Sequence, residues 1–66
     1  MTVADFYKVL DDDSYVVLYD TNYSVQLEVF QGDSDNIPLK YMNFVITRIA
    51  ADIIEGKTVV YIIEIC

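Results

Sequence analysis

The sequence predicts a small α+β domain, in which a mainly antiparallel four-stranded sheet carries an N-terminal helix on one face. An N-terminal segment has helical spacing of apolar residues, and four later segments are rich in β-branched and aromatic residues between polar turns. The last of them, residues 58–65, is apolar on both faces. Such a strand is expected at the centre of a sheet or against a second subunit, because one face in water would leave apolar side chains uncovered.

The first predicted element is a helix that begins after Thr2. Thr2 is a good N-cap, and Asp5 follows it at the spacing of a capping box, where a negative charge also suits the helix dipole. The predicted apolar face consists of Val3, Phe6, Tyr7 and Leu10. The polar run 11–14 is expected to end the helix, since Asp and Ser prefer turns and caps.

A hairpin is predicted next. Residues 15–19 are expected to form its first strand, residues 20–22 its turn and residues 23–30 its second strand. The second strand alternates, with Tyr23, Val25, Leu27 and Val29 on one face and Ser24, Gln26 and Glu28 on the other. Alternation of this kind predicts that one face of the sheet is in contact with water at this strand.

The second half of the chain predicts a loop, a helical turn and another hairpin. Residues 31–36 are polar turn formers, and residues 38–42 suit a single helical turn that Asn36 could cap. Residues 44–49 favour a strand, with a helix over residues 43–54 as the competing interpretation. We prefer the strand, because Glu55 and Gly56 are a turn signal directly before the final strand.

The length of 66 residues indicates one domain, and a chain this short is marginally stable as a monomer. One cysteine excludes an internal disulfide, and without histidine a single thiol cannot build a zinc site. Self-association is the remaining source of stability. We therefore expect a homo-oligomer and place its interface on the second face of the last strand, at Val60 and Ile62. A symmetric pairing of strand edges between two copies is the alternative.

The charge is strongly acidic: 11 acidic residues against four basic ones give a net charge of −7 and a pI near 4.1. Repulsion from phosphates argues against direct binding of nucleic acid, and the same field favours a protein partner with a basic surface. The more general interpretation is that the acidity only keeps an apolar chain soluble.

Six tyrosines are many for this length, and tyrosine is enriched at protein interfaces because its ring buries well and its hydroxyl tolerates water. The competing interpretation is that aromatic residues simply suit strands. The candidate partner-binding residues lie around the first hairpin and are Asp11, Asp12, Asp13, Tyr15, Tyr19, Asp20 and Tyr23.

No pattern in the sequence indicates catalysis, a metal or a cofactor. The acidic run 11–13 lacks the glycine and glutamate of a calcium loop, and Cys66 has no histidine partner that would activate it. The sequence shows no signal peptide and no apolar run long enough for a membrane span. We therefore expect a cytoplasmic protein that is not an enzyme.

Several short motifs, taken in order and at their spacing, resemble small uncharacterised accessory proteins encoded by bacterial phages and prophages. They are Thr2-Val3, Leu10–Asp13, Val17–Asp20, Ile37-Pro38 and the hairpin at Gly56-Lys57. The resemblance covers most of the chain, although the extra aromatic residues of the second strand and the very apolar last strand depart from it. It implies an accessory role, such as that of an anti-CRISPR protein or another inhibitor of host defence.

These observations predict a small acidic interaction module that occupies a basic surface on a larger protein, such as a nucleic-acid-binding or defence protein. Two alternatives stay open. One is a structural or assembly protein that self-associates through its C-terminal strand, and the other is a small-ligand binder with a pocket between subunits.

Overall fold

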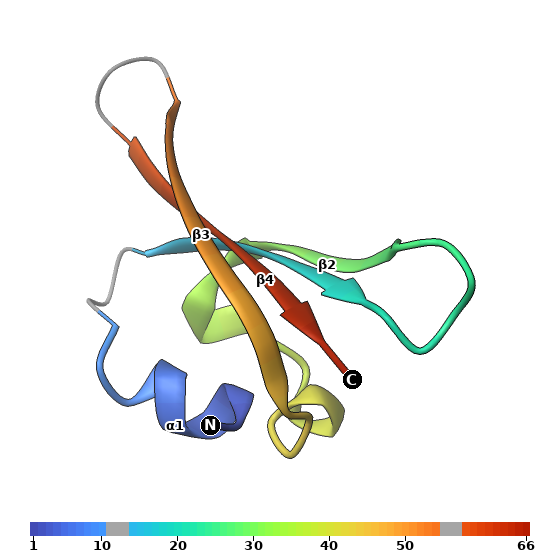
Figure 1. The fold of residues 1–66 in the computed structure, drawn as a ribbon. Helices are drawn as coiled ribbons and strands as arrows, with labels where there is room; N and C mark the ends of the chain where they lie inside the picture. Colours follow the sequence, from blue (N-terminus) through green and yellow to red (C-terminus); the bar gives the residue numbers. More distant parts are fainter. Residues whose placement is uncertain (11–13, 55–57) are drawn as a thin grey trace.

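A computed structural model describes residues 1–10, 14–54 and 58–66. The helix is α1 (Val3–Tyr7), the strands are β1 (Tyr15–Asp20), β2 (Leu27–Asp33), β3 (Ile46–Ile54) and β4 (Thr58–Ile65), and the two 3-10 turns are η1 (Ser34–Asn36) and η2 (Leu39–Tyr41). The four strands form one sheet, with α1 and the 3-10 turns on one of its sides (Figure 1). The predicted α+β class, the four strands and the N-terminal helix are confirmed.

The sheet is mixed, so the prediction of a mainly antiparallel sheet was wrong in this respect. The strand order is β2-β1-β4-β3, in which both hairpins are antiparallel but β1 and β4 pair in parallel. The cause lies in the connection between the hairpins. β2 ends beside the start of β1, whereas β3 begins at the level where β1 ends, so the 3-10 turns carry the chain along the sheet and β4 then runs in the direction of β1.

The start of α1 follows the prediction closely. The backbone N–H of Asp5 donates to Thr2 Oγ1 at 3.3 Å, and the backbone N–H of Thr2 donates to Asp5 Oδ2 at 3.0 Å, which completes a capping box. The Thr2 N–H bond holds the pKa of the Asp5 carboxyl below its ordinary value, with smaller help from the Thr2 side chain and the charge of Lys8. The helix is shorter than expected and ends at Tyr7.

The second strand lies further along the chain than the alternation predicted. β2 begins at Leu27, so residues 21–26 form the connection and the predicted three-residue turn at 20–22 was wrong. Residues 31–33, expected in a loop, continue β2 because Gln31, Gly32 and Asp33 pair with β1 opposite residues 15–17. Gly32 makes this possible, since its φ of 153° is one that residues with a Cβ rarely adopt.

Residues 46–54 form β3, which confirms the strand interpretation over the helix and extends it beyond residue 49. The helical turn expected at residues 38–42 is η2, whose N-cap residue is Pro38 and not Asn36. The extended strand shows that the Ala50–Asp52 segment, despite its poor strand propensity, is held in place by pairing with β4 opposite residues 60–62.

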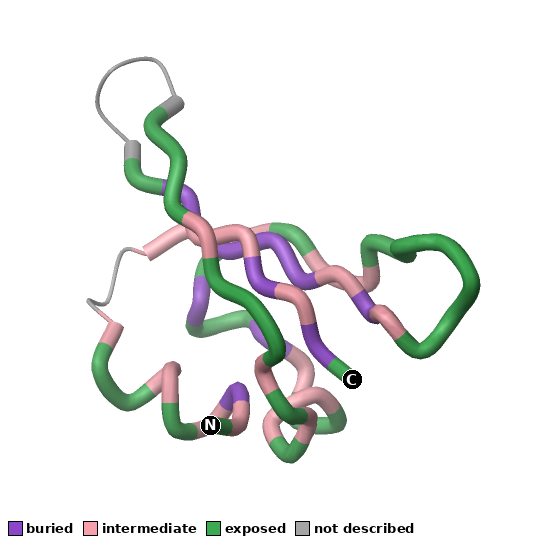
Figure 2. Tube along the Cα trace, in the orientation of Figure 1, coloured by how far each residue is buried: buried purple, intermediate pink, exposed green. Residues whose placement is uncertain are grey.

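The core lies on the side of the sheet that α1 covers. Its buried members are Val3, Val16, Leu18, Ile37, Ile63 and Ile65. Phe6 of α1 packs edge-to-face against Tyr61 of β4, with ring centroids 5.5 Å apart. Figure 2 shows the buried residues concentrated along the two inner strands and the exposed residues along the outer ones. Of the two positions expected for residues 58–65, the centre of a sheet or contact with a second subunit, the structure shows the first.

Candidate binding face of the sheet

The face of the sheet opposite α1, here called the open face, has three rows of side chains that cross all four strands. Residues that are opposite each other in register share a face, so the pairing of the strands fixes each row. From β2 to β3, the rows are Glu28, Tyr19, Glu64 and Arg48; Gln31, Val17, Ile62 and Ala50; and Asp33, Tyr15, Val60 and Asp52.

These rows divide the open face into an apolar centre and a charged border. The inner strands contribute valine, isoleucine and two tyrosines, while the outer strands contribute Glu28 and Asp33 on one side and Arg48 and Asp52 on the other. Together with Glu64, four carboxylates share this face with one guanidinium. A surface of this kind combines an apolar, aromatic centre with a mainly negative rim.

The apolar centre is largely covered, although none of the described helices lies over it. Val17 is 8% exposed and Val60 is 3% exposed. In register, Val60 lies between Tyr15 on β1 and Asp52 on β3, so side chains of the same sheet surround it. We predicted Val60 and Ile62 at an oligomer interface. In the single chain, Val60 exposes too little surface to form much of such an interface, and Ile62 is half-buried.

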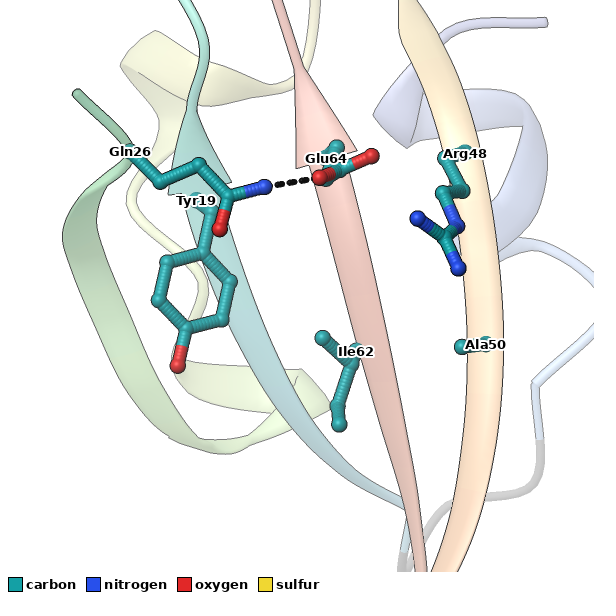
Figure 3. Close-up of a pocket in the computed structure, with 6 residues that line it drawn as sticks. All are labelled: Tyr19, Gln26, Arg48, Ala50, Ile62 and Glu64. Atoms are coloured by element: carbon teal, nitrogen blue, oxygen red, sulfur yellow. Dashed lines mark hydrogen bonds between the residues drawn. The ribbon is translucent and has the colours of Figure 1, made fainter.

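A hollow of about 330 Å³ opens on this face where the first two rows meet. It is lined by Tyr19, Gln26, Arg48, Ala50, Ile62 and Glu64 (Figure 3). The side-chain amide of Gln26, from the β1–β2 connection, donates a hydrogen bond to the carboxylate of Glu64. Arg48 reaches from β3 toward β4, so its guanidinium faces the hollow beside Glu64 (Figure 3).

The hollow has the chemistry of a binding site for one polar side chain or a small polar molecule. Ile62 and Ala50 supply an apolar floor, and the groups around it offer donors and acceptors of both charges. Its volume is at the lower end of the roughly 300–1,000 Å³ typical of ligand pockets. All of its lining residues belong to a single chain, so the site does not require the pocket between subunits that the ligand-binding alternative assumed.

The structure separates the candidate partner-binding residues that the sequence analysis grouped together. Tyr15 and Tyr19 lie half-buried on the open face. Asp20 lies on the other face, 7% exposed, and its Oδ1 accepts a hydrogen bond of 2.9 Å from the backbone N–H of Asn22. Tyr23, 59% exposed, is in the β1–β2 connection, and Asp11, Asp12 and Asp13 are outside the described residues.

Sequence reasoning did not single out the polar and charged side chains of the open face and its hollow. They come from four segments that only the strand order brings together, and they are Gln26, Glu28, Asp33, Arg48, Asp52 and Glu64. The parallel pairing of β1 with β4 would have been the signal, because it sets Glu64 beside Tyr19. That pairing is not visible in the local pattern of either strand.

The described ranges 1–10, 14–54 and 58–66 contain neither a candidate metal site nor a candidate membrane span. No group of three or more His, Cys, Asp or Glu side chains there could hold a metal ion, and no helix there has the length and apolar character to cross a membrane. Comparison with protein-family models, curated proteins and solved structures found no match.

Proposed function

We propose that this chain is a small acidic interaction module whose open face binds a basic surface on another protein. The observation that supports it is the arrangement of that face: two tyrosines and an apolar centre within a border that is mainly carboxylate. Interfaces typically combine an aromatic and apolar centre with a polar rim. The charges of the open face favour a basic partner, because four carboxylates share this face with a single guanidinium.

The net charge of −7 favours a basic partner, as does the excess of carboxylates on the open face. An acidic chain attracts a basic partner over a distance of about 8–10 Å at physiological salt and so increases the rate of encounter. The tyrosines and Ile62 then supply the short-range contacts, since each can bury a ring or an aliphatic side chain without leaving a charge unpaired.

The more specific form of the proposal names a cytoplasmic protein that itself binds nucleic acid. Carboxylates held on a rigid sheet occupy the basic groups that would otherwise contact phosphates, and the module then acts as an inhibitor. This agrees with the resemblance to phage-encoded accessory proteins such as anti-CRISPR proteins, which stays a prediction. In this role the chain needs no catalytic group, metal or cofactor.

The test compares two variants with the same net charge. Glu28→Lys changes the border of the open face by two units of charge. The variant N36K/N43K makes the same change at two exposed asparagines outside that face. Each protein is immobilised and exposed to a bacterial lysate, and the retained basic proteins are quantified and then challenged with DNA or RNA.

We expect wild type and N36K/N43K to retain the same basic protein, and Glu28→Lys to lose it by about tenfold, which corresponds to roughly 1.4 kcal/mol. If the partner is a nucleic-acid-binding protein, added DNA or RNA should release it from the immobilised chain. Equal retention by the wild type and both variants, or retention of chaperones alone, would count against the proposal.

The hollow supports ligand binding as a second candidate function. Arg48 beside an apolar floor suits a small carboxylate, which the guanidinium can bind through two parallel hydrogen bonds. A panel of small carboxylates and amides would be tested by thermal shift, because a ligand that binds only the native state raises Tm. A shift that Arg48→Gln abolishes would favour this function, and the absence of any shift would remove it.

A further inference from the structure

Within the part of the chain that the structure describes, the outer edge of β3 has no strand partner over one defined length. At its start, the N-terminus pairs with it: the N–H of Val3 donates to the carbonyl of Phe44 at 3.0 Å, and the N–H of Ile46 donates to the carbonyl of Met1 at 2.8 Å. Beyond Ile46, no described strand pairs with this edge, because β3 is the last strand in the sheet order. The unpaired part therefore begins at Thr47 and continues to the end of the strand.

An open edge of this length invites pairing with another strand, and charged side chains on the edge decide which strand is accepted. The charged residues of β3 are Arg48 and Asp52, which lie four positions apart on the open face with Ala50 midway between them. Opposite charges placed symmetrically about one residue are self-complementary. When two copies of such a strand pair antiparallel about that residue, each arginine is opposite the aspartate of the other copy.

Other registers lose this match. A shift of two residues in either direction, which keeps each side chain on its own face, leaves both charges without a partner of opposite sign. A further shift of two residues places either arginine opposite arginine or aspartate opposite aspartate. Because each chain carries a net charge of −7, a register that adds local repulsion is disfavoured further. The edge charges therefore specify one register.

The apolar side chains of β3 add a reason for pairing. On the face of the sheet that α1 covers elsewhere, Ile49 is 41% exposed and Ile53 is 63% exposed. The end of β3 projects beyond the helix (Figure 1). In the symmetric register, Ile49 lies opposite Ala51 of the other copy, so part of this surface leaves water. β2, the other edge strand, carries Glu28 and Asp33 and no basic residue, so it lacks a matching pattern.

We propose that two copies of this chain associate through the outer edges of their β3 strands, antiparallel and centred on Ala50, to form a continuous eight-stranded sheet. The two-fold axis is perpendicular to the sheet, as it is for any antiparallel pair of identical strands within one sheet. Both open faces then lie on the same side of the dimer. The dimer goes beyond the proposed function and leaves its binding face free, whereas stacking through Val60 and Ile62 would cover that face.

One hydrogen bond must be exchanged when the edges meet. The backbone N–H of Ile53 donates to Asp52 Oδ1 at 2.8 Å in the single chain. In the dimer, the N–H groups of this edge donate to carbonyl groups of the second copy, and the released Asp52 carboxylate meets Arg48 of that copy. The exchange conserves hydrogen bonds and adds two charge pairs by symmetry.

The first test reverses the charges. Asp52→Arg places one arginine opposite Arg48 of the other copy at each of the two symmetric sites. It is the cleaner single change because Asp52 is beside Val60 and not beside a charge of its own chain. The double variant R48D/D52R restores opposite charges in the same register. Sedimentation velocity over a dilution series gives the dissociation constant of each protein, and circular dichroism confirms that each is folded.

We expect a wild-type dimer, a weakening of about tenfold or more for Asp52→Arg, and recovery of most of that loss in the double variant. A wild-type protein that stays monomeric throughout the series overturns the proposal, as does a dimer that Asp52→Arg leaves unchanged. A double variant as weak as the single one overturns the register centred on Ala50.

The second test does not depend on charge. In the variant A50C/C66S, the two new thiols lie opposite each other on the two-fold axis, with Cβ atoms roughly 4.5–5.5 Å apart, within reach of a disulfide after a small adjustment. The control E28C/C66S places a thiol on the other edge strand, on the same face of the sheet. Mild oxidation should link A50C/C66S into a covalent dimer at least ten times faster than the control. Equal rates would overturn the β3 interface.

Discussion

Two neighbouring valines of β4 allow a direct test of how the open face is covered. Val60 is 3% exposed on that face, and Val59 is 44% exposed on the other face. Replacing either valine with alanine removes the same two carbon atoms and the same strand preference. The difference in the free energy of unfolding between the two variants therefore reports how much more deeply Val60 is buried than Val59.

The magnitudes follow from burial. Two buried methylene-sized groups are worth about 1.6 kcal/mol, and the cavity left at a covered site increases the cost of Val60→Ala to about 2 kcal/mol. Val59 is only about half buried, so Val59→Ala should lose about half of that burial free energy, roughly 0.8 kcal/mol. A difference of about 1 kcal/mol corresponds to roughly 4–8 °C in Tm for a domain of this size.

The assay is urea unfolding followed by circular dichroism at several protein concentrations. If side chains of the same chain cover Val60, the cost of Val60→Ala is the same at every concentration. If a second copy covers it, the cost shrinks on dilution. A Val60→Ala variant that is no less stable than Val59→Ala would refute the account of the open face, because it would show that Val60 is not buried.

Three further changes test the local structure. Thr2→Ala should lower stability by about 1 kcal/mol in urea unfolding through loss of the helix cap, whereas Thr2→Ser keeps the acceptor oxygen and should cost much less. The lowered pKa of Asp5 means that its contribution is complete above its ordinary value of 3.8 and is lost as the pH falls through the lower folded value; an acid titration of Asp5→Asn should lack this component. Gly32→Ala should cost about 1–2 kcal/mol in thermal unfolding from backbone strain at its positive φ, since the added Cβ would meet the Phe30 ring only at an ordinary 3.4 Å. A pH profile of Asp5→Asn that matches wild type, or an unchanged Tm for Gly32→Ala, would contradict these two accounts.

The elements that the sequence predicted well are those decided by local chemistry. The capping box at Thr2 and Asp5 depends on atoms three residues apart, and the apolar run at 58–65 requires burial on both faces wherever it lies. The helical turn η2 follows from Pro38, whose fixed φ suits the residue before a turn. In each case the signal and the structure lie within the same few residues.

The predictions that were wrong concern features that depend on contacts between segments far apart in the sequence. The alternation over residues 23–30 is a strong strand pattern, yet Tyr23 and Val25 are exposed outside the sheet because β1 ends at Asp20 and offers no further partner. Gln31–Asp33 lacks strand propensity and is a strand because β1 lies beside it. The parallel contact between β1 and β4 depends on the path of the 3-10 turns, which no local pattern encodes.

The candidate site was predictable only in part for the same reason. Tyr15 and Tyr19 were identified because tyrosine is informative at any exposed position, and both lie on the open face. The neighbouring Asp20 was grouped with them by sequence proximity, although strand alternation turns it to the opposite face, where it binds the N–H of Asn22. Residues that are adjacent in a strand belong to different surfaces, so a binding site on a sheet is defined by register.

The position of the tyrosines determines how the proposed interaction has to be tested. Tyr15 lies directly beside Val60 in register, so its ring helps to cover the centre of the sheet as well as forming part of the candidate surface. Truncating it would weaken folding and binding together, and a lost interaction would have two explanations. Glu28 and Asp33 lie at the border on an outer strand and are exposed, so reversing their charge changes the partner's electrostatic environment with little effect on packing. The border acids can therefore separate a role in recognition from a role in stability, which the more conspicuous aromatic residues cannot do.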